Sequence, residues 1–368
     1  MKKLMIVGAG YAGAVFGRLA AEDGYHVELI DQKDHVGGHS YSYPDPDTGV
    51  EIQQYGPHIF HTNYEDVYRF ITRFTRLNKF INRVKAIYHD RVYSMPVNLH
   101  TINQFFDKNF TPTAAKSFIE SKQIHFERVS NFKEAVLSSL GRELYDAFFR
   151  DYTIKQWGVQ PEEIAVSTAK RLPVRYNYDD NYFNDNYQGV PVEGYGALFK
   201  KMLDHKNITL SLKTPFETIK DNWKRKFDTL VFTGSIDQYF DYCFGALPYR
   251  TIRFEKIVGK EIQGNAVINY TDMSVPFTRI HEHKWFTPER HFEKSVAFRE
   301  FSAATDSRKA PYYPVENEKS MVLYRRYKTL AEKEKNLILI GRLAQFKYYN
   351  MDQVTKSSID AYNQFKKL

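Results

Sequence analysis

The feature that most constrains the fold is a glycine motif directly after an apolar segment near the start of the chain. Residues 3–7 (KLMIV) are typical of a buried strand, and Gly8-Ala9-Gly10-Tyr11-Ala12-Gly13 follows at once. A helix is expected from there to about Asp23, and a second strand over 25–30 ends on Asp31. This order predicts a βαβ unit of a Rossmann-like fold and places the chain in the α/β class.

The same residues predict a dinucleotide site. Gly8 permits a tight turn, Gly10 lets a pyrophosphate approach the backbone, and Gly13 lets the helix pack on the strand. Asp31 is placed to accept a hydrogen bond from a ribose hydroxyl, and its charge would repel a 2′-phosphate. The alternative is a glycine turn that sterics alone require, and the complete βαβ context favours the dinucleotide site.

Segments at both ends of the chain favour FAD over an exchangeable NAD. The doublet Gly37-Gly38, followed by His39, allows a second close approach of backbone to ligand, although an ordinary turn would also explain it. Near the carboxyl end, a strand over 337–341 leads into Gly341-Arg342, and a helix over 352–366 begins at Asp352. A buried FAD requires a site that residues far away in the sequence complete, and an exchangeable NAD does not.

These elements predict a discontinuous FAD-binding domain into which other domains are inserted. Alternating polarity around a turn at 89–90 predicts a hairpin over 83–98, and leucines spaced three and four apart predict helices between about 100 and 160. The expected division is an FAD-binding domain (1–81, 201–250, 321–368), a helical domain (99–175, with a mobile loop near 164–175) and an antiparallel sheet domain (82–98, 176–200, 251–320).

Composition bounds the cellular setting. The 368 residues carry a net charge of +8 and one cysteine, Cys243, which cannot form an internal disulfide. This favours a reducing compartment, so we expect a cytoplasmic protein. The glycine motif interrupts the apolar start, which argues against a secretory signal, and no later run is long enough to suggest membrane insertion.

Two arginines lie in segments that are not obvious solvated helix faces. Arg171 stands in KRLPVR (170–175) and Arg279 in PFTR (276–279). The planar guanidinium suits a diphosphate better than a lysine does, so a pair of arginines across a cleft would form a pyrophosphate clamp. Surface arginines in a basic protein are the equally open alternative.

Aromatic residues, 16% of the chain, cluster near these arginines in sequence. A base or sugar could stack on such rings while phenols bind phosphates or hydroxyls. Interleaved basic and aromatic residues could also mean single-stranded nucleic acid, but the absence of a basic block and the acidic Asp179, Asp180 and Asp185 argue against it. Phe148 belongs to the leucine stripe and is expected in the core.

Two histidines, His58 and His61, stand three apart in YGPHIFHTN (55–63). No further ligand follows at a diagnostic spacing, so a histidine near the cofactor is a better interpretation than a metal site, and no metal is expected. A second group, His281, Glu282 and His283, lies on an alternating segment whose neighbours should point to opposite faces.

Taken together, the motifs resemble bacterial UDP-galactopyranose mutase over essentially the whole chain. The shared segments are GAGYAGAVFGR (8–18), IDQKDHVGGHSY (30–41), YGPHIFHTN (55–63), NLHTINQFF (98–106), AFFRDYTIKQWG (147–158), KRLPVRYNYDDNYF (170–183), PFTRIHEHKWF (276–286), APYYPV (310–315) and GRLAQFKYYNMD (341–352). The resemblance implies interconversion of UDP-galactopyranose and UDP-galactofuranose without net redox change, through a covalent adduct between the sugar and N5 of reduced FAD.

The resemblance also implies roles for single residues. Arg171 and Arg279 would bind the diphosphate, and His61 would lie close to flavin and sugar and assist proton movement. The implied substrate contacts, which now include Phe148, are Phe148, Phe149, Tyr152, Thr153, Trp157, Tyr182, Asn269, Tyr313, Tyr348 and Tyr349. The implied cofactor contacts are Gly8, Gly10, Gly13, Asp31, Gly37, Gly38, His39, Gly341, Arg342 and Asp352.

Other readings stay open. Lys170 and His61 match galactose-specific relatives, which favours galactose over the N-acetylated sugar of a UDP-N-acetylgalactopyranose mutase. An FAD-dependent amine or polyol oxidase would share the glycine motifs but would oxidise its substrate and would not require the arginine pair. The resemblance further implies a homodimer, an external electron donor such as NAD(P)H or a reductase, and no nucleic-acid partner.

Overall fold

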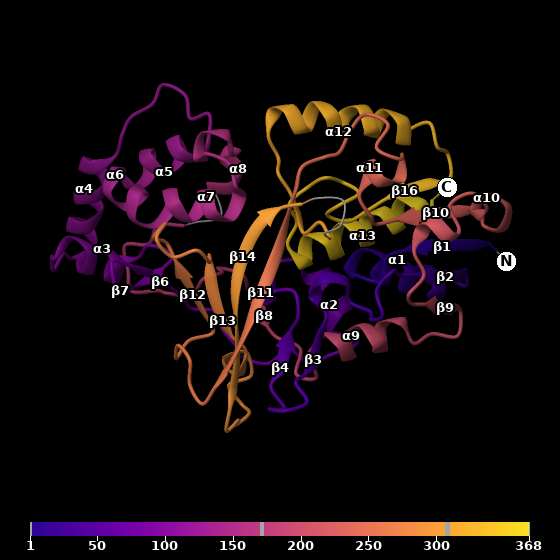
Figure 1. Ribbon diagram of the computed structural model, residues 1–368, viewed down its shortest axis with the longest axis horizontal. Coiled ribbons are helices and arrows are strands. Elements are labelled where there is room, and N and C mark those ends of the chain that lie inside the picture. The colour runs from indigo at the N-terminus through magenta and orange to yellow at the C-terminus, as the bar shows by residue number, and fades with distance from the viewer. Residues whose placement is uncertain (1, 170–172, 306–309, 368) are drawn as a thin grey trace.

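The computed structural model describes residues 2–169, 173–305 and 310–367 of the chain. Figure 1 shows a helical lobe on the left, a sheet of long strands in the middle and, on the right, a lobe that contains both chain ends. The α/β class is confirmed, while the exact domain boundaries stay a prediction.

A parallel sheet forms the centre of the lobe with both termini. Its five strands lie in the order β16-β10-β1-β2-β9, and every pairing is parallel. The bounds are β1 Lys3–Val7, β2 His26–Ile30, β9 Ile208–Ser211, β10 Thr229–Phe232 and β16 Leu337–Leu339. The strands expected at both ends of the chain therefore share one sheet, with β10 inserted between them.

Both faces of this sheet are covered. Leu4 and Ile6 of β1 belong to the same buried cluster as the inner faces of three helices: α1 Tyr11–Glu22, α9 Gly194–Leu203 and α13 Met351–Phe365. Met5 points the other way and packs with Trp223 and Phe232. Strand residues that alternate between two apolar layers explain why this segment is apolar throughout.

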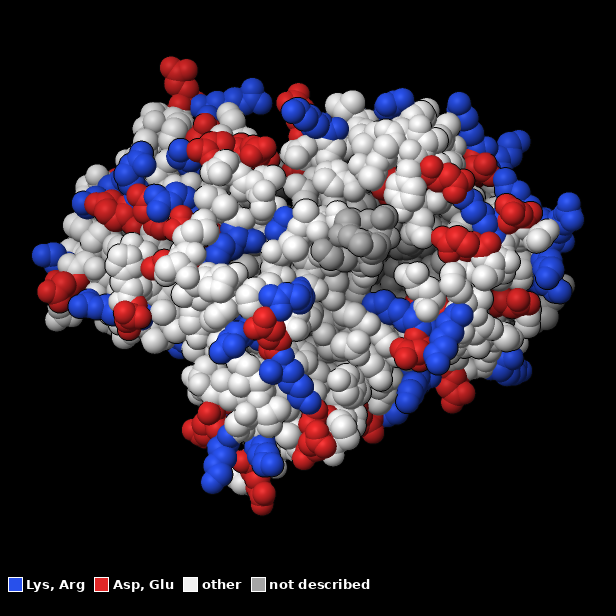
Figure 2. All heavy atoms as spheres, in the orientation of Figure 1, with Lys and Arg blue, Asp and Glu red and all other residues white. Residues whose placement is uncertain are grey.

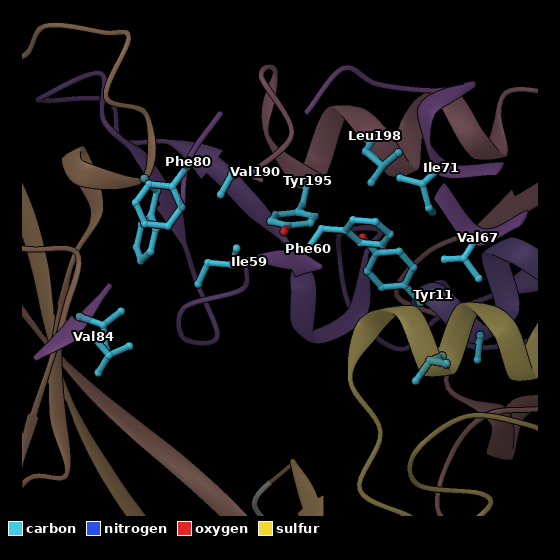
Figure 3. Close-up of a cluster of buried hydrophobic side chains, with 14 of the residues drawn as sticks. Tyr11, Ile59, Phe60, Val67, Ile71, Phe80, Val84, Val190, Tyr195 and Leu198 are labelled. Carbon is cyan, nitrogen blue, oxygen red and sulfur yellow. The ribbon is translucent and has the colours of Figure 1, made fainter. Parts of the chain in front are cut away.

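The position of helix α9 differs from the expected division into domains. The sequence assigns residues 176–200 to the antiparallel sheet domain, but α9 packs against α1. Figure 3 shows Tyr195 and Leu198 of α9 in one cluster with Tyr11 of α1 and Phe60. Because the buried face of α9 packs on α1, tertiary packing places this helix with the nucleotide lobe.

The middle of the molecule is a seven-stranded sheet in the order β15-β11-β14-β13-β12-β6-β7. The bounds are β6 Val84–Tyr88, β7 Arg91–Met95, β11 Tyr249–Gly259, β12 Val267–Tyr270, β13 Arg279–Glu282, β14 Ser295–Ala304 and β15 Tyr313–Pro314. The β6–β7 hairpin turns at His89 and Asp90, as the polarity pattern predicts. One pair, β12 with β6, is parallel, so the sheet is mixed and not purely antiparallel.

The helical lobe carries side chains toward that sheet. Its helices are α3 Leu99–Phe106, α4 Pro112–Lys122, α5 Phe132–Leu140, α6 Arg142–Tyr145, α7 Asp151–Trp157 and α8 Val166–Ala169. A π-helical segment, Asp146–Arg150, joins α6 to α7. Asn98, Thr111 and Asn131 cap α3, α4 and α5 through side-chain oxygens that accept backbone N–H bonds.

Short elements complete the fold. They are β3 Ser42–Pro44 paired with β4 Glu51–Gln53, β5 Phe60–Thr62 paired with β8 Tyr187–Gly189, and the helices α2 Glu65–Thr72, α10 Trp223–Lys226, α11 Ile236–Tyr239 and α12 Glu318–Ala331. Among the described residues, no helix is long and apolar enough to cross a membrane. On the face in Figure 2, acidic and basic side chains are interspersed, which does not favour a polyanion surface.

Candidate active site

A first cavity of about 230 Å³ lies at the carboxyl end of β1 and β2. The predicted cofactor residues that line it are Gly8, Gly10, Asp31, Gly37, Gly38, His39, Gly341 and Arg342. The structure thus brings together segments from both ends of the chain, as the predicted discontinuous FAD-binding domain requires. We call this space the dinucleotide cavity.

Glycine is sterically required in the wall of the dinucleotide cavity. Gly8 has φ +106°, and a Cβ there would lie 2.0 Å from the hydroxyl oxygen of Thr233. A Cβ on Gly38 would lie 3.1 Å from the Cα of Gly10, so the two loops meet backbone to backbone. Gly13 does not line the cavity; its Cβ would lie 2.0 Å from the carbonyl oxygen of Gly8, so it serves the packing of α1 on β1.

Asp31 closes this cradle. Its carboxylate accepts hydrogen bonds from the N–H of Ala9 at 2.7 Å and of Lys33 at 2.8 Å. Each oxygen keeps a further lone pair for a ribose hydroxyl. At its start, α1 has the N-cap Gly10, which offers no side-chain bond, so the positive end of the helix dipole faces a cradle of backbone. These residues fit the pyrophosphate and ribose of FAD.

A second cavity, of about 440 Å³, continues from the first. His39, His58, Tyr312 and Arg342 border both, and we call the second space the central cavity. His39 stacks on Tyr312 with ring centroids 4.2 Å apart. Burial lowers the pKa of His58 to about 4, so this ring stays neutral at physiological pH.

His61 lines the central cavity. Its ring stacks on Phe183 at a centroid separation of 3.6 Å, and Nδ1 hydrogen-bonds to the carboxylate of Asp185.

Asp352 lies near His61 but is not part of the cavity walls. Its side chain is buried, forms a hydrogen bond with the Thr62 side chain and keeps one oxygen without a partner. Burial, opposed by His61, raises the pKa of Asp352. Met351 and Val354 of the same helix line the dinucleotide cavity instead.

A third cavity, of about 800 Å³, opens between the helical lobe and the sheet. It shares Tyr152, Tyr182, Asn269, Arg279, Tyr313 and Tyr348 with the central cavity. Every substrate contact implied by the resemblance lines this aromatic cavity: Phe148, Phe149, Tyr152, Thr153, Trp157, Tyr182, Asn269, Tyr313, Tyr348 and Tyr349.

Phe148 reconciles its two interpretations. Its side chain is 2% exposed and packs on Tyr93 at 5.0 Å and Phe105 at 5.5 Å between ring centroids, as a core residue does. It also lines the aromatic cavity. The ring is therefore a cavity wall supported from behind, and its place in the π-helical segment sets it beside Phe149.

Arg279 lines the aromatic and central cavities from β13. Its Nε donates to Glu300 at 2.7 Å, and Glu300 lies opposite it on β14 and is fully buried. Burial opposes the charge of Arg279, but Glu300, Tyr152 and Tyr313 together raise its pKa well above the ordinary value. Arg279 therefore presents a permanent cation to a cleft of aromatic rings.

The other predicted arginine, Arg171, and Lys170 lie outside the described residues. On either side of them, Thr168 lines the aromatic cavity and Pro173 the central cavity. The role of Arg171 and the mobility of the loop near 164–175 stay predictions.

Some residues of the cavities were not singled out from the sequence. Lys33 holds its Nζ 3.8 Å from the ring centroid of Tyr55, and burial lowers the pKa of Lys33 to about 8. The buried Asn82 lines the central cavity and has an amide oxygen without a partner. Tyr55 and Tyr312 belong to the shared segments 55–63 and 310–315, which could have identified them; Asn82 carries no comparable signal.

Comparisons with known proteins agree with this geometry. A family model described as UDP-galactopyranose mutase matches residues 147–348, and one described as an NAD(P)-binding Rossmann-like domain matches residues 6–74. A Klebsiella pneumoniae protein named probable UDP-galactopyranose mutase is 43% identical over 366 residues, which cover 99% of this chain and 94% of the relative. The dTDP-fucopyranose mutase of Escherichia coli is 42% identical over 366 residues, covering 98% and 97%.

Among solved structures, a crystal structure of reduced UDP-galactopyranose mutase is similar to this fold. The TM-score is 0.76 at 15% sequence identity, and the match covers 100% of this chain and 96% of that one. This likeness supports the fold, while the family model and the full-length relatives carry the assignment. The motifs, the linked cavities and these matches agree, and the chain belongs to the UDP-galactopyranose mutase family.

Proposed function

We propose that this protein interconverts UDP-galactopyranose and UDP-galactofuranose, with no net redox change, while it holds FAD in the reduced state. The observation that carries the proposal is the continuity of the cavities: the dinucleotide cavity leads through the central cavity into the aromatic cavity. An isomerase that uses a bound flavin on a nucleotide sugar requires this sequence of spaces.

The glycine cradle and Asp31 would hold the adenosine diphosphate part of FAD, and His39 and Arg342 border the space for the flavin ring. When bound, reduced FAD supplies the nucleophile for the anomeric carbon of the sugar. The protein's part is to fix the sugar over that nucleophile and to exclude water, which the surrounding rings favour.

The aromatic cavity would bind the nucleotide. The rings of Phe148 and Phe149 provide stacking surface for uracil, and Arg279 faces the diphosphate with a charge that Glu300 holds in place. As the anomeric bond breaks, UDP takes up negative charge, so this preorganised cation stabilises the leaving group. Arg171 is proposed as the second arginine of the clamp.

Ring contraction exchanges the sugar oxygen that bonds to the anomeric carbon, from O5 to O4. In this direction O5 gains a proton as the larger ring opens, and the hydroxyl at C4 loses its proton as it closes the smaller ring; the reverse reaction exchanges these two roles. His61 in the central cavity is proposed to hold this proton. No proton is consumed overall.

The test is a product assay with the purified holoprotein. UDP-galactofuranose is incubated with and without dithionite, and the products are separated by chromatography. We expect conversion to the pyranose in the reduced sample alone. No conversion with intact reduced flavin would refute the proposal, and flavin-dependent oxidation of amines or polyols would instead support an oxidase.

The dTDP-fucopyranose mutase relative makes dTDP-fucose a second candidate substrate, because it is nearly as similar as the Klebsiella protein. The two substrates differ at the base, at the ribose 2′ position and at the C6 hydroxyl, which fucose lacks. Parallel assays with both furanoses and with the N-acetylated UDP-sugar decide among them by the ratio of kcat/KM values. We expect UDP-galactofuranose to give the highest.

For the cellular setting, we propose a cytoplasmic homodimer that receives electrons from an external donor such as NAD(P)H or a reductase. Its product would serve the synthesis of a cell-surface polysaccharide. The single cysteine and the family membership support this setting.

A further inference from the structure

The imidazole of His61 is held on more than one side. Phe183 covers a ring face, with 12° between the ring planes. At the ring edge, Nδ1 hydrogen-bonds to Oδ2 of Asp185, while the other carboxylate oxygen of Asp185 accepts from the side-chain amide of Asn63. A histidine in contact with both a ring and a carboxylate has little rotational freedom.

Strand pairing brings these groups together from distant parts of the chain. His61 lies opposite Gln188 in the β5–β8 pair, and Asp185 lies just before β8. The N–H of Asn186 donates to the side-chain oxygen of Asn63 at 2.9 Å, which fixes the turn that carries Asp185. The backbone contacts of this turn therefore fix the position of the Asp185 carboxylate beside His61.

The chemistry of this contact determines the state of the ring. An ionised carboxylate can only accept a hydrogen bond, so Nδ1 of His61 must carry a proton. In the neutral ring, Nε2 is then left with a lone pair. Both His61 and Asp185 line the central cavity, between the dinucleotide and aromatic cavities.

We propose that Asp185 is a positioning residue that holds His61 in the Nδ1–H tautomer, so that Nε2 accepts a proton from the substrate. This inference rests on the proposed function. From pyranose to furanose, O5 gains a proton as the six-membered ring opens, and the C4 hydroxyl gives its proton to Nε2 as the five-membered ring closes. Nε2 then releases this proton to solvent, which replaces the proton taken up at O5, so atoms and charge balance in each turnover. Asp185 holds the ring and does not exchange the proton.

A purely structural role is the competing explanation, because Asp185 also binds Asn63. The deciding variant is Asp185→Asn, which keeps the size of the side chain but can offer an N–H to Nδ1 and so favour the other tautomer. In the reduced holoenzyme we expect kcat to fall by about 100-fold, within the range for loss of general acid–base catalysis, with KM changed by less than about twofold. Flavin content and the thermal midpoint should stay unchanged.

A double-mutant cycle separates action through His61 from any other action. In the His61→Ala background, adding Asp185→Asn should cause no further loss of kcat. Asp180→Asn is the matched control: Asp180 lies on the same segment, is paired with Arg83 and Lys85, and should leave kcat unchanged. Full kcat in Asp185→Asn, or a loss that adds to that of His61→Ala, would overturn the proposal.

A readout independent of turnover distinguishes this proposal from the proposed function. In the [¹⁵N]histidine-labelled holoprotein, the signals lost in His61→Gln identify His61, and their shifts report which nitrogen carries the proton. We expect Nδ1–H in the wild type and a changed pattern in Asp185→Asn. An Nε2–H tautomer in the wild type would overturn the assignment of Asp185, whereas an absent mutase activity with an intact Nδ1–H signal would refute only the proposed function.

Discussion

Arg279 keeps its orientation because its partner is buried on the neighbouring strand. Glu300 makes a hydrogen bond through one oxygen, and the other oxygen has no partner. A buried carboxylate that is satisfied on one side costs stability, while its bond to Nε fixes the direction of the guanidinium. The sequence motif identifies Arg279, but Glu300 lies 21 residues away and becomes visible only through the register of β13 and β14.

Replacing Glu300 by Gln should therefore affect binding. Without the carboxylate, the guanidinium loses its fixed orientation, so we expect KM for the nucleotide sugar to rise by about tenfold while FAD stays bound. Because Arg279 is partly open to the cavity, the free energy of unfolding should fall by only about 2 kcal/mol. Steady-state kinetics and urea unfolding measure both effects.

The control for this change is Glu255→Gln. Glu255 lies on β11 of the same sheet, in an exposed pair with Arg253, and should leave KM and stability nearly unchanged. An unaltered KM in Glu300→Gln would show that Arg279 does not depend on its partner.

At the scale of elements, Lys155 of α7 fastens the helical lobe to the sheet. Its Nζ lies 2.6 to 3.2 Å from the carbonyl oxygens of Tyr270, Asp272, Val275 and Phe277, which share its three N–H donors. These carbonyls belong to the end of β12, the strand that carries Asn269, and to the segment that joins it to β13, which begins at Arg279. One side chain thus couples the two walls of the aromatic cavity.

We expect Lys155→Met to loosen this connection. The methionine fills similar volume but leaves the carbonyl oxygens without a donor, so the free energy of unfolding should fall by about 1–3 kcal/mol. kcat/KM should fall as well, because Tyr152 and Trp157 lie on the same helix. Urea unfolding and steady-state kinetics test this, with the exposed Lys116→Met on α4 as the control; an equal effect of both variants would contradict it.

Sequence patterns predicted most elements but not their irregularities. The leucine spacing indicates helices between 100 and 160, yet it cannot reveal the π-helical segment 146–150, because one extra residue in a turn changes hydrogen bonding and not composition. Alternation over 281–283 predicts that neighbours point to opposite faces, but it does not predict that His281, Glu282 and His283 are all buried. Other parts of the chain cover this segment on both sides, and the polarity of its residues does not predict that burial.

At the scale of the whole molecule, buried neutral histidines connect folding to pH. Burial lowers the pKa of His58 to about 4 and of His283 to about 3, and it lowers the pKa of His39 and His281 well below the ordinary value. In the unfolded chain these rings take up protons near pH 6.5. The unfolded state therefore binds more protons below that pH, and acid favours it.

The free energy of unfolding should therefore decrease as the pH falls from about 6.5 toward 4, by roughly 1 kcal/mol per pH unit for each of these rings. Glu51, Asp237 and Asp352, whose pKa values burial raises, act in the opposite direction, chiefly at the lower end of this range. Urea unfolding of the holoprotein between pH 7.5 and 5 measures the slope.

Replacing one buried histidine should reduce the change in the free energy of unfolding per pH unit by the contribution of one proton. His283→Gln is therefore the informative variant. His26→Gln is its control, because the His26 side chain is 36% exposed. A slope that is the same in wild type and His283→Gln would contradict this origin of the pH dependence.

The nucleotide lobe also has a consequence for the order in which the protein can mature. β1, α1 and β2 are synthesised well before β10, which pairs with β1 on the side opposite β2, and before α13, which covers α1. The helical lobe, made from consecutive segments, can fold before β10 has been synthesised and has paired with β1. Because Gly341 and Arg342 line the dinucleotide cavity, its wall is complete only once synthesis has passed these residues, so we expect flavin loading to follow their synthesis.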